Sequence, residues 1–133
     1  MIDQFSHIGI KAQDPHTTAT WLEERLDAKR LDSGEFGFDG WGQSVEFVGL
    51  EIGDKNAFIV DPTPYEAAGV VEDVDEGIAH FGLAVDDCEA AITEMIARGG
   101  EQLLEPFELG DTRYGFCDGP AGFRIEFVEP LSP

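Results

Sequence analysis

Basic residues are scarce in this chain. Only 8 of its 133 residues are Lys or Arg, against 28 Asp or Glu, so the formal net charge is -20. Nucleic-acid binders neutralise phosphates with clustered Lys and Arg, and eight basic side chains cannot form such a patch. The same shortage excludes attraction to an anionic membrane surface. We therefore expect neither nucleic acid nor membrane as a partner.

Cysteines and long apolar runs are also few. Cys88 and Cys117 lack the spacing of metal ligands and are too few for a disulfide framework, so we interpret them as reduced thiols. No stretch approaches the length of a membrane-spanning helix, and residues 1–4 lack the basic and then apolar start of a signal peptide. These features predict a cytoplasmic protein.

The apolar content, in contrast, is ample. Hydrophobic residues make up 42% of the chain and aromatic residues 11%, which predicts a folded single domain over residues 1–133 rather than a disordered acidic chain. The acids are spread along the sequence instead of forming a tail. This distribution predicts an acidic, halophile-like surface suited to a salty cytoplasm, where screening relieves self-repulsion.

A short motif occurs twice. Residues 7–10 read His-Ile-Gly-Ile and residues 80–83 read His-Phe-Gly-Leu, an offset of 73 residues. Asp14 and Asp87 keep the same offset, and each precedes a helical pattern as an N-cap residue does. We expect the helices to turn the following residues inward: Trp21, Leu22 and Leu26 in the first, and Ile92, Met95 and Ile96 in the second.

Strand-like patterns follow each helix. In the first half residues 34–42 predict a strand and a tight return, and residues 44–52 and 57–60 predict two further strands. In the second half residues 102–104, 113–117 and 123–128 play the same parts. The chain is therefore predicted to be an α+β fold of two βαβββ modules that form an open, curved mixed sheet around a cleft. Module 1 covers residues 2–62, the linker residues 63–76 and module 2 residues 77–130.

Strand alternation predicts which side chains face away from the helices. Ile8 and Ile10 pack beneath the first helix, so His7 points to the opposite face, and His80 and Glu126 do the same on their strands. Two imidazoles and a carboxylate suit a divalent metal with free coordination positions, whether Zn, Mn, Ni, Fe or Mg. The competing interpretation is two core histidines and a carboxylate paired with Arg124. The repetition of the histidine favours the metal site.

The motifs resemble those of the vicinal oxygen chelate superfamily, which includes glyoxalase I, bleomycin-resistance proteins, fosfomycin-resistance enzymes, methylmalonyl-CoA epimerase and extradiol dioxygenases. The resemblance is carried by the repeated His-x-Gly strands, the Asp-capped helices and residues 113–127, and it extends over residues 2–130. It implies paired modules around one divalent metal. It also implies a homodimer that is able to exchange modules.

One departure from this family concerns the end of module 1. Glyoxalase I and the epimerase carry a Glu or Gln on its last strand, where alignment places Phe58 opposite Glu126. The remaining His-His-Glu set resembles extradiol dioxygenases and fosfomycin-resistance transferases. The former also use an acid–base His that does not bind the metal, for which only His16 is left. The latter need a cationic pocket, for which only Arg113 and Arg124 are placed.

The predicted chemistry follows from the metal. A small substrate would chelate it through neighbouring oxygens, and Glu126 would move the proton while an enolate or alkoxide forms. Arg113 and Tyr114 are candidates to hold an anionic or phenolic group, although Tyr114 is equally typical of a half-buried strand residue. Phe58 and Trp41 are candidates for the apolar wall of the substrate site.

Two classes of function remain open at this stage. The first is a metal-dependent lyase, isomerase or transferase of glyoxalase type, with an extradiol-type dioxygenase as a variant. The second is a non-catalytic small-molecule binding protein of bleomycin-resistance type. The three ligand positions favour the enzyme, whereas the missing carboxylate and the acidic charge, which suits a cationic ligand, favour the binder.

Overall fold

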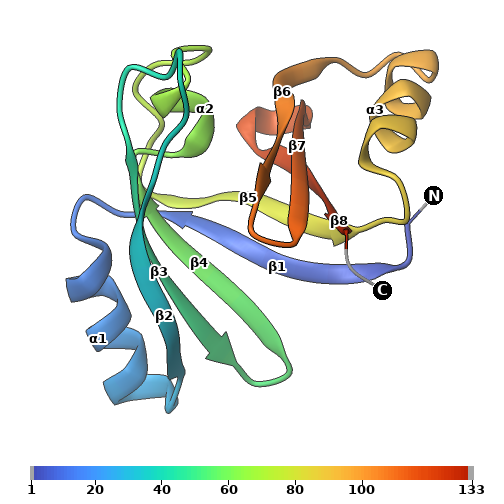
Figure 1. Cartoon of the computed structure of the whole chain (residues 1–133). Helices are drawn as coiled ribbons and strands as arrows, with labels where there is room; N and C mark the ends of the chain where they lie inside the picture. The colour runs from blue at the N-terminus through green and yellow to red at the C-terminus, as the bar shows by residue number, and fades with distance from the viewer. Residues whose placement is uncertain (1, 132–133) are drawn as a thin grey trace. The chain divides into compact units, whose positions relative to one another are not determined.

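The computed structural model describes residues 2–131 (Figure 1). These residues form two compact units: the first unit covers residues 7–79, and the second unit covers residues 80–131 together with residues 2–6. None of the helices within residues 2–131 is both long and apolar enough to cross a membrane.

The first unit contains one four-stranded mixed sheet with a helix on it. Its strand order is β2-β3-β4-β1, with β1 parallel to β4 and the other neighbours antiparallel. Helix α1 contacts β2, β3 and β4 (Figure 1). The elements are β1 (Gln4–Lys11), α1 (Pro15–Leu26), β2 (Lys29–Phe36), β3 (Val45–Ile52), β4 (Lys55–Asp61) and α2 (Pro64–Ala67).

The second unit repeats this arrangement. Its strand order is β5-β8-β7-β6, with β5 parallel to β8, and helix α3 contacts β6, β7 and β8. The predicted α+β class with two βαβββ modules is therefore confirmed. The elements are β5 (Gly77–Ala84), α3 (Cys88–Ala97), β6 (Gln102–Leu109), β7 (Thr112–Asp118), the 3-10 turn η1 (Pro120–Gly122) and β8 (Arg124–Pro130).

Both predicted helix caps are confirmed. An Asp14 carboxylate oxygen accepts the backbone N–H of Thr17 at 3.2 Å, and Asp87 accepts that of Ala90 at 3.0 Å. Each aspartate thus satisfies one of the N–H groups that a helix start leaves without an intrahelical partner. Bonds from the Thr17 side chain and backbone also hold the pKa of Asp14 below its usual value.

The predicted inward faces of the helices are partly wrong. Leu22, Ile92 and Met95 pack on the cores, but Trp21, Leu26 and Ile96 are 52%, 55% and 50% exposed. Trp21 precedes Leu22 by one residue and therefore points about 100° away around the helix. Leu26 and Ile96 lie in the last turns of their helices.

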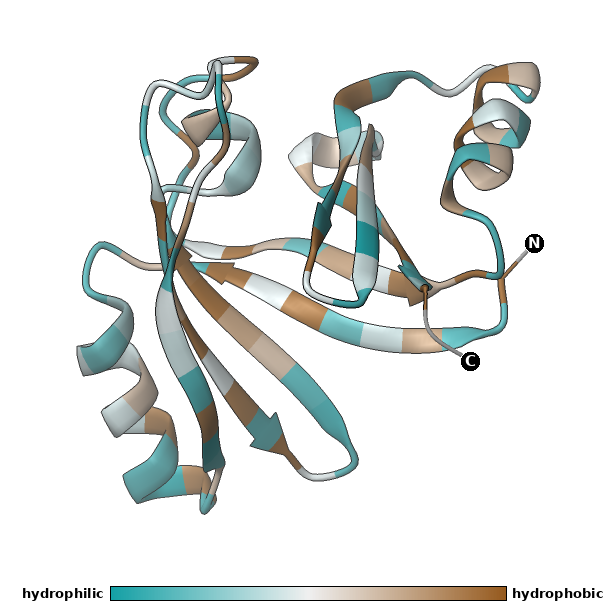
Figure 2. Ribbon diagram, viewed as in Figure 1, coloured by the Kyte–Doolittle hydropathy of each residue, from teal (hydrophilic) through white to brown (hydrophobic). Residues whose placement is uncertain are grey.

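Each unit has its own hydrophobic core between sheet and helix. In β1 hydrophobic segments are separated by hydrophilic or neutral ones, as Figure 2 shows, and in each unit one face of the sheet packs against its helix. The first core contains Ala12, Ala19, Ala28, Val48, Leu50 and Ile59, and the second contains Val85, Cys88, Ala91, Ile92, Cys117 and Phe127.

The predicted linker is more ordered than expected, because α2 lies within it. Thr63 and Glu66 form a capping box at its start. Glu66 also accepts a hydrogen bond from the Lys11 ammonium at 2.6 Å and one from the backbone N–H of Val74 at 3.0 Å. Burial by itself would raise the pKa of Glu66, but these bonds hold it below its ordinary value of 4.5. One carboxylate therefore joins strand, helix and linker.

Candidate functional site

The second unit carries a buried imidazole and carboxylate on neighbouring strands. His80 in β5 is 3% exposed and Glu126 in β8 is 5% exposed. Gly82 is the register partner of Glu126, and His80 Nε2 lies 3.6 Å from Glu126 Oε1. That separation is within the range of an ion pair and beyond that of a hydrogen bond. A carboxylate at this depth requires a compensating charge or donor.

Aromatic rings line this pair within the second unit. The ring of Phe116 in β7 meets the imidazole of His80 edge to face, with centroids 5.1 Å apart, and Phe116 is the register partner of Glu126. Phe107 stacks on both Phe116 and Tyr114. Since Tyr114 and Phe116 are two residues apart, they share one face of β7. The predicted residue Tyr114 therefore belongs to the aromatic surface beside the pair.

The first unit places His7 at the equivalent position. His7 in β1 is 4% exposed, and its ring meets Phe58 edge to face at 5.0 Å. Gly9 is the register partner of Phe58, just as Gly82 is the partner of Glu126. The register thus confirms that Phe58 stands where the second unit has its carboxylate. A phenyl ring offers neither a ligand atom nor a proton acceptor.

A glycine makes room for Phe58. Gly49 in β3 is its register partner, at the place that Phe116 occupies in the second unit. A Cβ added at Gly49 would lie 3.1 Å from the Phe58 ring and 2.5 Å from a carboxylate oxygen of Asp32. In each unit the histidine thus packs on one phenyl ring, carried by β4 in the first unit and by β7 in the second.

Arg113 lies on the other face of β7. Alternation places it with Gly115 and Cys117, which face α3, and opposite to Tyr114. Its guanidinium pairs with Glu108 at 3.0 Å and with Glu129 at 3.4 Å. The hydrogen bond that Arg113 donates to Glu108, followed by the charges of Glu129 and Glu108, raises the pKa of Arg113. Its position gives no support to the predicted contact with a substrate.

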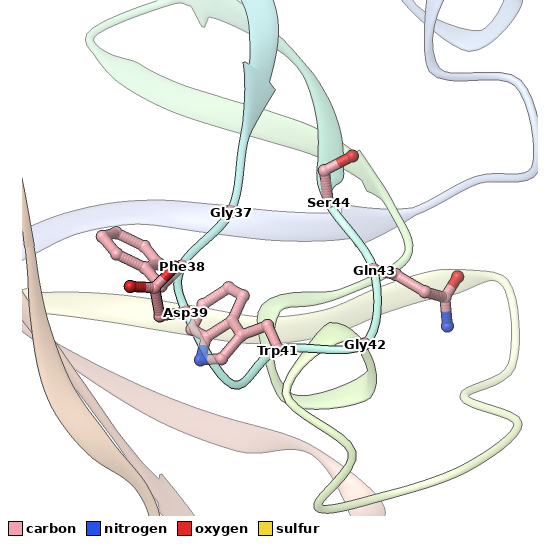
Figure 3. A pocket seen from close by; sticks show the side chains of 7 residues that line it. All are labelled: Gly37, Phe38, Asp39, Trp41, Gly42, Gln43 and Ser44. Carbon is pink, nitrogen blue, oxygen red and sulfur yellow. The ribbon is translucent and has the colours of Figure 1, made fainter.

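Trp41 lies in the loop that joins β2 to β3. Residues 37–44 line an open cavity of about 400 Å³ here, shown in Figure 3. A strand and a tight return were predicted at residues 34–42, and β2 does end at Phe36 before this loop. Phe38 and Asp39 were not predicted as binding residues. The glycines at positions 37, 40 and 42 were the available signal for a loop.

The third histidine and the two cysteines lie away from these positions. His16, in the first turn of α1, is exposed, and its Nδ1 lies 3.1 Å from a guanidinium nitrogen of Arg30. Cys88 and Cys117 are free and fully buried in the second core. Burial raises the pKa of Cys88 to about 12. A thiol that stays protonated is a poor nucleophile, as expected for a core residue.

Comparison with known proteins assigns the family. Residues 4–127 match the model of the Glyoxalase/Bleomycin resistance protein/Dioxygenase superfamily, so the chain belongs to this superfamily and the predicted resemblance is confirmed. The chain is 27% identical over 133 residues to the lactoylglutathione lyase of Haemophilus influenzae, covering 97% of this chain and 94% of that protein.

One further relative and one solved structure also resemble the chain. A probable chloroplastic lactoylglutathione lyase of Arabidopsis thaliana is 27% identical over 92% of this chain, which spans 35% of that protein's length. The crystal structure of methylmalonyl-CoA epimerase from Mycobacterium tuberculosis shares the fold, with a TM-score of 0.74 and 20% identity over 99% of this chain and 90% of that one.

Proposed function

We propose that this protein is a divalent-metal-dependent, glyoxalase-like lyase or isomerase that acts on a small substrate bearing two neighbouring oxygens. The observation that carries the proposal is the buried His80–Glu126 pair, with His7 at the matching strand position. The relationship to lactoylglutathione lyases supports the same reaction class. We further propose a cytoplasmic homodimer, the assembly that the family resemblance implies.

Within the second unit His80 and Glu126 fit a divalent metal, and we propose His7 of the first unit as its third ligand. Imidazole nitrogen and carboxylate oxygen are the donors that Zn, Mn, Ni and Fe accept in such sites. Two donors bound to one ion at about 2.1 Å lie about 3.0–3.5 Å apart for bond angles between 90° and tetrahedral. The 3.6 Å between His80 Nε2 and Glu126 Oε1 is close to this range. A cation would also compensate the buried carboxylate.

In the proposed reaction Glu126 moves the proton. A carboxylate has two oxygens, so one is available to accept a proton from a substrate carbon while the other stays a ligand. The metal, when bound, supplies the Lewis acidity that stabilises negative charge on the neighbouring oxygens of the substrate. Phe116 and Tyr114 keep this region apolar, which strengthens each electrostatic contact. Tyr114 also offers a hydroxyl donor, and Phe58 an apolar wall.

Phe58 restricts the stereochemistry of such a reaction. Inversion at a carbon atom requires that a proton leaves from one side and another arrives from the opposite side. With Phe58 at the position equivalent to Glu126, the first unit has no carboxylate at this strand position. We therefore favour proton removal and return by Glu126 on one side of the substrate, as in a proton shift between adjacent carbons, over a two-base epimerisation.

Metal analysis tests this proposal directly. The wild type and the variants His80→Ala and Glu126→Gln would be dialysed against Zn, Mn, Ni or Fe(II), and the retained metal measured by mass spectrometry. We expect one equivalent in the wild type and little in either variant. His16→Ala is the matched control, since it removes an exposed imidazole, and should retain the metal. Equal metal in the wild type and His80→Ala would refute the proposal.

Activity assays then divide the candidate reactions. Methylglyoxal with a thiol tests the glyoxalase-type reaction, and a catechol under oxygen tests the extradiol-type dioxygenase, the variant that the three-ligand set favours. The alternative is a non-catalytic binding protein of bleomycin-resistance type. The absence of a second carboxylate at Phe58 and the aromatic cavity at residues 37–44 favour that alternative. It requires no metal, so the metal analysis separates it from both enzymes.

A further inference from the structure

The loop between β2 and β3 contains a closed turn with two aromatic ends. The backbone N–H of Trp41 donates to the carbonyl of Phe38 at 3.0 Å, and Gly40 has φ +87°. A positive φ at the third residue of a four-residue turn is typical of a type II turn and favours glycine there. The turn brings the Phe38 and Trp41 rings to an edge-to-face contact with centroids 4.9 Å apart.

This turn is held in place by its surroundings in the first unit. The backbone N–H of Gly42 donates to the carbonyl of Ala67 in α2 at 2.9 Å. Phe36 contacts both turn aromatics, with centroids 6.2 Å from each, and packs with Trp41 on the cluster of Val45, Val60 and Ala67. The rings are therefore positioned before any ligand arrives, which lowers the entropic cost of binding.

The open cavity beside the turn is lined by two aromatic side chains and one carboxylate, together with glycines and polar residues. Phe38 and Trp41 are half-buried and Asp39 is exposed, and in Figure 3 their side chains lie on the same side of the loop, whereas Gln43 points away. Residues 31–54, which contain the turn, include six acidic residues and no Lys, Arg or His. Aromatic faces next to a carboxylate suit a positively charged group.

We propose that the turn Phe38–Trp41 is a binding site for a small organic cation of the primary or quaternary ammonium class. The cationic group would lie against the rings of Phe38 and Trp41, with Asp39 as its counter-ion. The net charge of -20 would raise the local concentration of such a ligand. The same negative charge would repel a polyanionic ligand. This site lies within the first unit and is independent of the proposed metal chemistry.

Choline and its uncharged isostere 3,3-dimethylbutan-1-ol are suitable probes, because they differ in charge but hardly in shape. The chain has two tryptophans, so the indole N–H signals of Trp41 and Trp21 can be followed together by NMR, with Trp21→Phe to assign them. Trp21 is 52% exposed on α1 and serves as an internal control for non-specific contact. We expect a saturable shift of Trp41 with choline in the millimolar range and a much weaker response to the isostere.

Two carboxylate variants complete the test. Asp39→Asn keeps the shape of the turn and should weaken choline binding about five- to tenfold. Asp54→Asn, in the exposed turn between β3 and β4, makes the same charge change elsewhere and should leave affinity within about twofold. Glu126→Gln should still bind choline, since the site does not depend on the metal. Equal responses of Trp41 and Trp21, equal binding of both probes, or no saturation would overturn the proposal.

Discussion

The two units share one backbone pattern but differ in where they place large side chains. At the strand centre, the first unit pairs Gly49 with Phe58, and the second unit pairs Phe116 with Glu126. The phenyl ring is on β4 in the first unit and on β7 in the second. The strand of the second unit that is equivalent to β4, which is β8, carries the carboxylate. The backbone thus specifies where a ligand can stand, while local packing decides which unit provides it.

The same exchange occurs between helix and strand. Ala19 of α1 and Ile92 of α3 occupy equivalent helix positions, 73 residues apart, and register makes Val48 equivalent to Gly115. A Cβ at Gly115 would lie 2.6 Å from Ile92 and 2.8 Å from the Cys88 sulfur. The first unit therefore combines a small helix residue with a larger strand residue, whereas the second unit combines a large helix residue with a glycine on the strand. The two cores reach close packing by complementary solutions.

The largest expected effect comes from making the units alike at the metal ligand. Phe58→Glu would place a carboxylate beside His7 and lose a half-buried ring, at a cost of about 3–4 kcal/mol in the free energy of unfolding. We expect a divalent metal to restore much of this, because the new carboxylate would become a ligand. Urea denaturation with and without metal measures both terms. Phe58→Leu is the control, and its stability should show no metal-dependent recovery.

The helix–strand exchange predicts a coupled pair of substitutions. Ile92→Ala should cost about 2–3 kcal/mol by leaving a cavity, and Gly115→Val should cost at least about 1 kcal/mol by overpacking. Together the two substitutions give the second core the Ala and Val that the first core has. The double variant should therefore be more stable than the sum of the two single losses in the free energy of unfolding predicts. A double-mutant cycle from urea denaturation measures this coupling. Additive losses would contradict the equivalence of the two cores.

Glu66 fixes the linker of the first unit and should make its stability depend on pH. Its folded pKa is lowered, so its contribution is complete above pH 4.5 and is lost as the pH falls through the folded value. Glu66→Gln should lose about 1.5–2 kcal/mol at neutral pH, and its difference from the wild type should shrink in acid. Unfolding curves across pH measure this. The exposed Glu72→Gln makes the same charge change and should be nearly neutral.

Salt should affect both units in the same direction, with the smallest effect per residue. The first unit carries 16 acidic and 5 basic residues and the second 12 and 3, so neither is close to neutral. Transfer from molar to millimolar KCl lengthens the Debye screening distance from about 3 Å to 10 Å or more. We expect the melting temperature to fall by several degrees, as followed by circular dichroism. An unchanged melting temperature would count against the predicted adaptation to salt.

Much of this structure could be predicted because it depends on local patterns. The duplicated His-x-Gly strands and the caps Asp14 and Asp87 gave the two modules, and alternation gave the faces of His7 and His80. The alignment of Phe58 with Glu126 also held in the observed register. These features repeat within the chain, so each half served as a test of the other.

Other features depend on packing or on signals that were overlooked. Alternation by itself prevents adjacent Arg113 and Tyr114 from sharing a face, although both were predicted to hold substrate. Thr63 and Glu66 have the spacing of a capping box, but the four-residue helix that they start is too short to show periodicity. Trp21 lies outside because it points about 100° away around the helix from Leu22, which packs on the first core. The cavity at the Phe38–Trp41 turn depends on side-chain placement that no linear pattern contains.

The position of the cysteines gives this chain a built-in probe of local opening. Both thiols lie in the core of the second unit, and the first unit has none. A thiol reagent in solution can react only when that core opens, so its labelling rate measures how often the second unit opens locally. Whole-chain spectroscopic unfolding would report on both units. The difference between the two measurements would show whether the half that holds His80 and Glu126 unfolds alone or only with its counterpart.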